Sequence, residues 1–435
     1  MSDSKVNLKR RTLIGAAAAS PLLAFAAFKP REHGGGHSAY FAKLQTALRD
    51  AGLWRPTLVV DRQALEHNVG RLQAHLPQSK HYRIVAKSLP SLELIRFVRE
   101  RTGTDRLMVF HQPFANFIAE RMPDARVLIG KPMPVGAAAR FFEYLKPGAF
   151  DPQQQMQWLI DTPEHLVQYR ELARARHNET GQPMQVSLEL DVGLHRGGLR
   201  TQEAVAELLM LLGAEPSMRF AGFMGYEAHA SKMPAILGGP RKALDEAMAF
   251  YADSVTTARN VLGSGFDERT LTLNAGGSST YQLYDDAAPC NELAMGSGLV
   301  MPTDFDKPTL ADHRPAAFIA TPVLKALPST RLPGIEFMSP AFRAWDPNTA
   351  RTFYIYGGYW HADTVSPPGL QRNPIWGHST NQEMLNGSEQ VQLGVDDYVF
   401  LRPHQSEFVF LEFGDIAVFD GERITAAWPV FQQGA

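Results

Sequence analysis

The sequence predicts an α/β fold, a parallel (β/α)8 barrel of the TIM type followed by a separate C-terminal β-rich domain. Short apolar runs alternate with helical patterns about eight times over roughly 250 residues, as in such barrels. No Gly-x-Gly-x-x-Gly motif follows the first run, which disfavours an open doubly wound sheet. From about Ala316 the helical periodicity gives way to short β-like runs. A chain of 435 residues with 44% hydrophobic content is long enough for both domains.

The elements follow in a regular order. Strands are expected at residues 57–61, 83–86, 106–110, 126–130, 157–161, 185–191, 220–224, 270–274 and 291–295. Helices are expected at residues 40–51, 62–75, 92–100, 114–122, 137–145, 163–176, 201–212 and 241–262. Further strands are expected at residues 353–356, 398–401, 408–411 and 416–419, with a hairpin turn at Asp420-Gly421. The expected division is a leader over 1–37, the barrel with its N-terminal helix over 38–315 and the β domain over 316–435.

Residues 1–37 form a predicted export signal and linker. Arg10 and Arg11 precede an alanine-rich apolar run that ends at Phe28, and Ala24-Phe25-Ala26 is a small-residue cleavage pattern. The paired arginines and the weak hydrophobicity favour the twin-arginine route and a periplasmic location. The 17 residues from Thr12 to Phe28 are short for a membrane span, so we expect no stable span after export. An uncleaved anchor or a disordered tail are the alternatives.

Composition excludes several classes of protein. A formal net charge of −2, with no basic block beyond the N-terminus, gives no indication of nucleic-acid binding. The single cysteine, Cys290, excludes an intrachain disulfide and a cysteine-cluster metal site.

Lys87 is the first candidate for chemistry. It ends the apolar run Arg83-Ile84-Val85-Ala86, so it lies at the carboxyl end of a predicted barrel strand, where active sites of such barrels are built. A partly desolvated lysine there can form a Schiff base with a carbonyl group or with pyridoxal phosphate. A surface lysine at a strand end is the alternative.

Two polar clusters follow later strands. Arg196 lies in the glycine-bracketed turn Gly193 to Gly198, where the backbone can approach a ligand and the arginine can bind an anion or a ring nitrogen. The alternative is a plain strand end with a solvated arginine. Tyr226, a carboxylate and His229 come just past the next strand, a grouping that suits acid–base work or a structural histidine.

A phosphate site is expected after the last two barrel strands. Gly276, Gly277, Ser278, Ser279 and Thr280 supply free backbone N–H groups and hydroxyls after one strand, as in a phosphate-binding nest. Ser297 and Gly298 follow the next strand and supply the other half. Barrels commonly bind phosphate after strands seven and eight.

A metal site in the β domain has thin support. His404 and Ser406 lie on one side of an extended segment, and one histidine with a serine falls short of an ordinary transition-metal ligand set. His361 and His378 are further candidates.

Taken in order, these motifs resemble the D-threonine aldolase and D-serine dehydratase family, relatives of alanine racemase. The resemblance covers the chain from about Arg55 to the C-terminus. Matching segments are Arg83 to Leu94, with Lys87 on the Schiff-base position; Glu189 to Gly198; Tyr226 to His229; Gly276 to Tyr281; and Glu292 to Gly296. Two positions depart from the family pattern: Leu89 replaces a histidine, and Ser406 replaces the cysteine or aspartate of the family's divalent-metal element.

The resemblance implies a pyridoxal 5'-phosphate enzyme, a homodimer whose β domain completes the active site. Arg196 and Tyr226 would contact the cofactor ring, and Lys87 or His229 would move protons. The implied activity is that of a lyase on D-β-hydroxy amino acids, by retro-aldol cleavage first and dehydration second. An amino-acid racemase on the same cofactor and a non-catalytic cofactor or amino-acid binding protein remain the alternatives.

Overall fold

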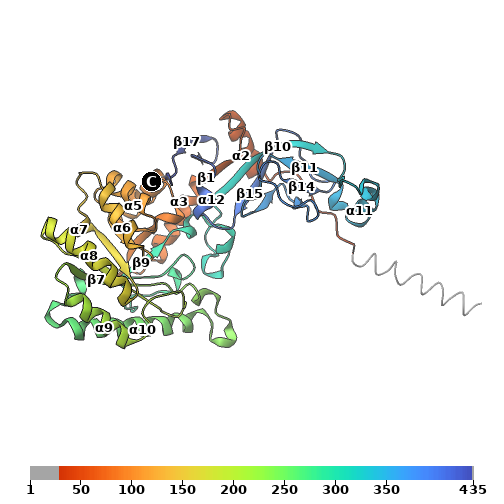
Figure 1. The fold of residues 1–435 in the computed structure, drawn as a ribbon. Coiled ribbons are helices and arrows are strands. Elements are labelled where there is room, and N and C mark those ends of the chain that lie inside the picture. The colour runs from red at the N-terminus through yellow and green to blue at the C-terminus, as the bar shows by residue number, and fades with distance from the viewer. Residues whose placement is uncertain (1–28, 434–435) are drawn as a thin grey trace, which may run out of the picture. The chain divides into compact units, whose positions relative to one another are not determined.

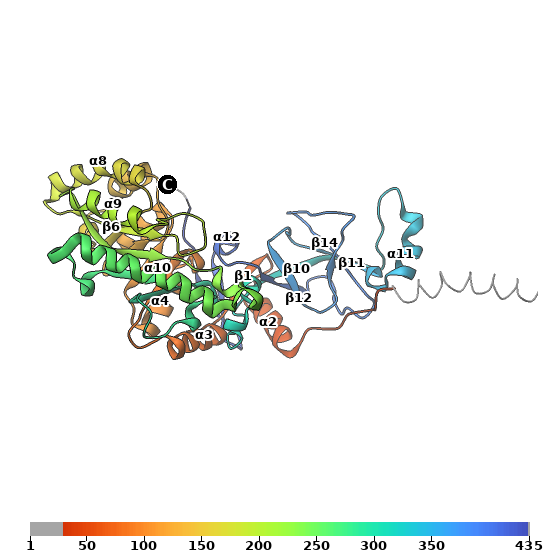
Figure 2. The same cartoon turned by 90° about the horizontal axis from the view of Figure 1, so that it is seen from below.

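A computed structural model describes residues 29–433, which form two compact units (Figures 1 and 2). The barrel unit consists of residues 57–318 and 402–433, and the β unit consists of residues 29–56 and 319–401. The predicted twin-arginine motif and apolar run lie outside the described residues. Within residues 29–433, no helix combines the length and apolar character that a membrane crossing requires.

The barrel unit is built on eight parallel strands that close on themselves. They are β2 (His81–Val85), β3 (Arg106–Val109), β4 (Arg126–Ile129), β5 (Met156–Ile160), β6 (Met184–Leu190), β7 (Met218–Gly225), β8 (Thr272–Ala275) and β9 (Glu292–Met295). Strand β2 pairs with β3 on one side and with β9 on the other, which closes the barrel. The predicted α/β barrel fold is confirmed.

Helices follow most of these strands and cover the barrel. They are α3 (Arg62–His75), α4 (Leu92–Thr102), α5 (Gln112–Arg121), α6 (Val135–Tyr144), α7 (Pro152–Gln155), α8 (Pro163–Thr180), α9 (Gln202–Gly213) and α10 (Gly239–Leu262). Figure 2 shows α8, α9 and α10 outside the strands. Side-chain caps begin several of them; Asp61, for example, accepts a hydrogen bond of 2.9 Å from the Ala64 amide at the start of α3.

The first predicted strand is correct in its bounds and lies outside the barrel. Strand β1 (Thr57–Asp61) pairs in parallel with β16 (Ile416–Phe419), which pairs in antiparallel fashion with β17 (Ile424–Trp428). A short, fully buried apolar run shows that a strand exists but does not identify its partner. The phosphate loops therefore do follow the seventh and eighth strands of the barrel, β8 and β9.

The β unit is a sheet of antiparallel pairs. Its strands are β10 (Ala317–Leu327), β11 (Arg351–Ile355), β12 (Ala362–Ser366), β13 (Gln371–Arg372), β14 (Met384–Gly387) and β15 (Tyr398–Pro403), and its α-helices are α2 (Ala39–Asp50) and α11 (Ser339–Trp345). Strand β10 pairs with β11 and with β15, and β11 pairs with β14.

The units are divided differently from the expected boundaries of 38–315 and 316–435. Helix α2 belongs to the β unit, and the chain from Arg402 onward returns to the barrel unit. The predicted strand at 408–411 is wrong, because the chain forms the single-turn helix α12 (Glu407–Phe410) there. Val409 and Phe410 are both buried while Phe408 is exposed, a pattern that an alternating strand does not produce.

The barrel interior is polar at one end and apolar in the middle. Arg83, Arg106 and Asn274 surround the fully buried carboxylate of Glu292. Next to them along the strands comes a cluster of buried apolar side chains: Met108, Leu128, Leu159, Met224 and Ala294. These close the barrel beneath its carboxyl end, so that this end forms the rim of a cavity.

Candidate active site

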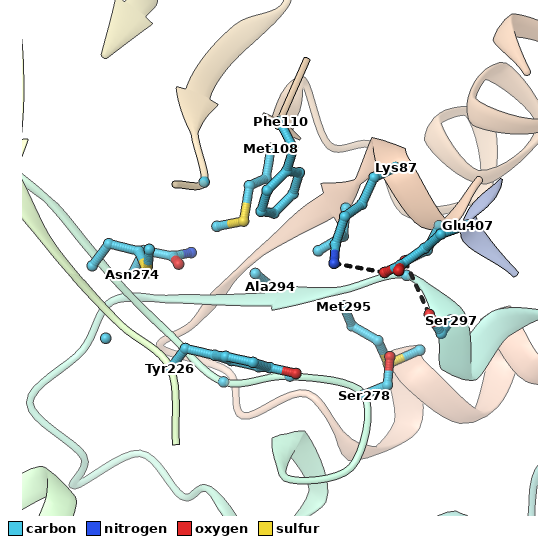
Figure 3. Close-up of a pocket in the computed structure, with 18 of the residues that line it drawn as sticks. Lys87, Met108, Phe110, Tyr226, Asn274, Ser278, Ala294, Met295, Ser297 and Glu407 are labelled. Atoms are coloured by element: carbon cyan, nitrogen blue, oxygen red, sulfur yellow. Dashed lines mark hydrogen bonds and ion pairs between the residues drawn. The ribbon is translucent and has the colours of Figure 1, made fainter. Parts of the chain in front are cut away.

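Lys87 stands at the carboxyl end of the barrel, in the single 3-10 turn (Ala86–Ser88) that directly follows β2. Its side chain lines a cavity of about 120 Å³ (Figure 3). The Lys87 Nζ atom lies 2.6 Å from Oε1 of Glu407 and 4.8 Å from the centroid of the Phe110 ring. A carboxylate and an aromatic face therefore hold the amine at the rim.

The cavity floor is apolar. Met108, Met224 and Ala294 line it from below, and Phe110 and Tyr226 pack against the same cluster. Such a floor keeps water away from the underside of a bound group and strengthens the polar contacts above it.

Arg196 and Tyr226 reach the cavity together. The guanidinium carbon of Arg196 lies 5.2 Å from the centroid of the Tyr226 ring. Asp191 holds the arginine loop in shape, because its Oδ1 accepts hydrogen bonds from the amides of Gly193 (3.2 Å) and His195 (2.8 Å). Burial, and secondarily the neighbouring carboxylate of Glu227, raise the pKa of Tyr226, so its phenol stays protonated at neutral pH.

His229 does not line the cavity. Its Nε2 lies against Gly193, where an added Cβ would be only 2.9 Å away. Its buried Nδ1 has no hydrogen-bond partner within the described part of the chain. The histidine therefore lies behind the arginine loop, where it supports the backbone at Gly193.

The glycine-rich loop after β8 is anchored by Glu227, a fully buried carboxylate. Glu227 accepts hydrogen bonds from the Gly276 amide (3.2 Å) and the Thr280 hydroxyl (2.5 Å), and Thr280 Oγ1 accepts one from the Gly277 amide (3.1 Å). These predicted phosphate ligands thus shape the loop internally. Within the described residues, the amides of Ser278 and Ser279 make no hydrogen bond and remain available.

The loop after β9 meets this loop at the cavity. The Gly298 amide donates to Ser278 Oγ at 2.9 Å, and Ser297 Oγ lies 2.9 Å from Ser88 Oγ. Glycines keep the space open: a Cβ on Gly277 would come within 2.6 Å of Tyr226 Cε2. The hydroxyls of Ser88, Ser278 and Ser297, the unused Ser278 amide and the Lys87 amine belong to residues that line one cavity. They fit the phosphate and the carbonyl group of pyridoxal phosphate.

The two metal candidates are not brought into a metal site. Ser406 is fully buried with its hydroxyl 3.4 Å from Ser297 Oγ, in the hydroxyl cluster of the cavity. Among residues 29–433, no group of three or more His, Cys, Asp or Glu side chains is placed to hold a metal ion. A lone histidine and a neutral hydroxyl do not make a suitable ligand set for a divalent metal.

A second cavity of about 530 Å³ adjoins the first and shares Lys87, Phe110, Arg196 and Glu407 with it. The second cavity is also lined by Glu189, Asp161, His111 and Lys131. Burial, and secondarily the nearby Asp161, raise the pKa of Glu189 to about 7. Burial and then Lys131 lower the pKa of His111. This mixed lining gives room for a substrate beside the lysine.

Several residues of the site were missed by sequence reasoning. Ser88 directly follows the lysine, and Glu407 directly follows Ser406, so proximity to a candidate was the available signal for both. Phe110 and Asn274 end predicted strands and carried no signal of their own. Glu227 was noted only as a member of the tyrosine–histidine cluster.

The fold and this cavity define the class of protein. The model of the family "Alanine racemase, N-terminal domain" matches residues 60–304, more than half of the chain. The chain belongs to this family of fold-type III pyridoxal-phosphate enzymes.

The chain is also similar to individual proteins and solved structures. The 3-hydroxy-D-aspartate aldolase of Paracoccus denitrificans is 27% identical over 149 residues, which cover 34% of this chain and 36% of that protein. The structure of D-threonine aldolase from Filomicrobium marinum matches with a TM-score of 0.66 at 16% identity, over 87% of this chain and 95% of that chain. D-threo-3-hydroxyaspartate dehydratase from Delftia sp. HT23 matches with a TM-score of 0.64 at 14% identity, over 87% and 98%. The two structural matches show the shared fold.

Proposed function

We propose that this protein is a pyridoxal-phosphate-dependent lyase that acts on D-β-hydroxy amino acids. The observation that carries the proposal is the Lys87 amine, which lines both the cavity that holds the serine hydroxyls and the larger second cavity. Relatives that include an aldolase for 3-hydroxy-D-aspartate and a structural neighbour named D-threonine aldolase support the reaction class.

The chain's residues divide the work of holding the cofactor. Lys87 would attach the cofactor covalently, and the substrate amine would replace it. The amides of Ser278 and Ser279 with the hydroxyls of Ser297 and Ser88 would bind the phosphate, and Arg196 and Tyr226 would lie against the ring. When bound, the cofactor supplies an electron sink for bonds at the substrate α-carbon.

Lys87 would also transfer the proton at the substrate α-carbon. When the substrate amine takes its place on the cofactor, the freed Lys87 amine would be able to exchange a proton at the substrate α-carbon. His229 would have an indirect role, because it supports the backbone of the loop that carries Arg196. Retro-aldol cleavage is the first choice of reaction, and dehydration is the second.

Product analysis separates the candidate reactions. Purified protein with added pyridoxal phosphate is incubated with D-threonine, D-serine, D-alanine and, as a control, L-threonine. Cleavage predicts glycine and acetaldehyde from D-threonine, and dehydration predicts ammonia and a 2-oxo acid. L-alanine from D-alanine would instead identify a racemase. A bound yellow cofactor with no turnover of any of the four would identify a binding protein and contradict the lyase.

Export and assembly complete the proposal. The arginine pair Arg10-Arg11 and the apolar run up to Phe28 support twin-arginine export to the periplasm. Changing both arginines to lysine is expected to retain the protein in the cytoplasm in a fractionation assay. We also expect a homodimer, which light scattering would show as twice the chain mass of 48.2 kDa.

A further inference from the structure

Glu407 is placed for chemistry that the proposed cofactor-binding residues do not perform. Helix α12 carries it to the rim of the barrel, where its carboxylate lines both cavities. Its Oε1 lies 2.6 Å from Lys87 Nζ. Figure 3 marks this ion pair with a dashed line. In the described residues, Lys87 is the sole ion-pair or hydrogen-bond partner of this side chain.

That partnership ends when Lys87 takes up a cofactor. An amine bonded to a carbonyl cofactor is no longer the free ammonium ion that pairs with Glu407. Until a substrate frees the amine again, the side chain of Glu407, which is only 29% exposed, would be a half-buried carboxylate without a partner. A hydrogen-bond donor on a ligand would offset the cost of that unpaired group.

The residues that the sequence singled out as acid–base or metal-binding groups are less suitable as the base. His229 lies behind the arginine loop and lines neither cavity. The phenol of Tyr226 stays protonated because burial raises its pKa. Ser406 and His404 assemble no metal-ligand set, and the Ser406 hydroxyl lies in the cavity's hydroxyl cluster. Among the described residues, Glu407 is the carboxylate that pairs with the Lys87 amine, to which the cofactor would be attached.

We propose that Glu407 binds the β-hydroxyl of the substrate and accepts its proton during cleavage; this inference rests on the proposed lyase function. The hydroxyl O–H bond breaks, its proton passes to the Glu407 carboxylate, and its electron pair forms the C=O bond of an aldehyde. The Cα–Cβ bond breaks, and its electron pair becomes the bond from Cα to a proton returned by Lys87 or Glu407. The products are an aldehyde and glycine, and the step consumes no other reactant.

A binding comparison tests the contact without relying on turnover. Glu407→Ala, Glu407→Gln and the control Glu412→Gln, at an exposed position outside both cavities, are first loaded with cofactor. D-threonine and D-2-aminobutyrate, which lacks only the hydroxyl, are then mixed rapidly with each protein, and the initial change in visible absorbance gives their affinities. Glu407→Ala is expected to lower the affinity for D-threonine by about tenfold or more. The affinity for D-2-aminobutyrate is expected to change by less than about twofold. An equal loss of affinity for both ligands, or an unchanged affinity for D-threonine, would show that Glu407 does not bind the β-hydroxyl.

Turnover tests the proton transfer. Glu407→Gln is expected to lower kcat for D-threonine cleavage by about 100-fold or more, the usual contribution of a general base, and Glu412→Gln to leave it unchanged. A kcat of Glu407→Gln within about threefold of the wild type would contradict the role.

Two further measurements distinguish a role of Glu407 from a role of a metal ion and from a failure of the proposed function. Wild-type cleavage is expected to survive treatment with EDTA; a loss that Mn²⁺ restores would overturn the inference, because a metal would then act on the hydroxyl. Failure of the wild type to bind pyridoxal phosphate would refute the proposed function before any Glu407 variant is compared.

Discussion

At the scale of single residues, the site depends on small side chains that leave room for a ligand. A Cβ on Gly277 would come within 2.6 Å of Tyr226 Cε2, and a Cβ on Gly296 within 2.7 Å of the Val85 carbonyl oxygen. Neither glycine has a positive φ, so space and not backbone conformation explains its presence. A methyl group at either position would have to move a wall of the cavity.

Gly277→Ala is expected to displace the Tyr226 ring and to weaken cofactor binding by about tenfold, at a stability cost of about 1–3 kcal/mol. Gly70→Ala, in α3 with no atom within 4 Å of the added Cβ, is the control and should stabilise the helix by about 0.5–1 kcal/mol. Cofactor affinity is measured by absorbance titration. Equal affinities for the Gly277 variant and the wild type would refute the steric argument.

Glu189 makes stability depend on pH. Its pKa rises on folding from 4.5 to about 7, so the folded state holds the proton more tightly than the unfolded state. Stability from this group is complete below pH 4.5 and is lost as pH rises toward 7. Glu189→Gln carries no such proton, so its stability relative to the wild type should rise between pH 5 and pH 8, by up to about 3 kcal/mol. Urea unfolding at both pH values checks this; the same difference at both would contradict it.

At the scale of elements, the barrel strands hold a buried ion pair at the end opposite the site. Arg83 on β2 pairs with Glu292 on β9, where the barrel closes, and Arg106 on β3 shares the carboxylate at 2.8 Å. The side chains of Arg83 and Glu292 are 2% and 0% exposed. Removing one partner of such a pair leaves a buried charge with fewer partners.

Arg83→Met is expected to lower the free energy of unfolding by about 3–5 kcal/mol. The matched control is Arg126→Met on β4, which breaks an exposed pair with Asp105 and should cost about 1 kcal/mol or less. Urea unfolding of the two variants beside the wild type gives both values. Equal costs would show that the buried pair has no special weight.

Periodicity predicted the elements of the barrel unit well because each helix buries one face and each strand is a short apolar run. Strand β1 and α3, for example, have the expected bounds of 57–61 and 62–75. It could not identify which strands pair, so β1 was counted with the barrel strands. The segment 408–411 was assigned to a strand because its apolar residues favour both forms, and only tertiary packing selects the helix.

At the scale of the whole molecule, the chain before α2 is part of the β unit. Asn348 bridges it by accepting from the His33 amide and donating to the Arg31 carbonyl, both at 2.8 Å. Ser388 Oγ donates to the His33 carbonyl at 2.6 Å. These bonds attach a segment that the sequence suggested was a linker.

Two truncations test this attachment. A chain that begins at residue 29 keeps these bonds and is the reference. A chain that begins at residue 38 loses them and should be less stable by about 1–3 kcal/mol, given about 1 kcal/mol for each hydrogen bond. Thermal unfolding of both proteins is the measurement. Identical unfolding of the two truncated chains would show that the segment contributes nothing.

The motifs predicted much of the site, because Lys87, Arg196, Tyr226 and Ser278 follow different barrel strands and a barrel brings those ends together. The sequence could not show that Glu227 accepts a hydrogen bond from the Gly276 amide, nor that Glu407 forms an ion pair with Lys87. Both depend on contacts between residues far apart in the chain, 49 residues for the first.

Attachment of the cofactor to the Lys87 amine underlies every proposed step. Purified protein loaded with pyridoxal phosphate is reduced with borohydride, digested and analysed by mass spectrometry, with Lys131→Ala, a lysine of the second cavity, as the control. We expect the phosphopyridoxyl group on Lys87 in the wild type and in the control, and its absence from Lys87→Ala together with loss of the yellow colour. Label on another lysine, or an unlabelled wild-type protein, would show that Lys87 does not hold the cofactor.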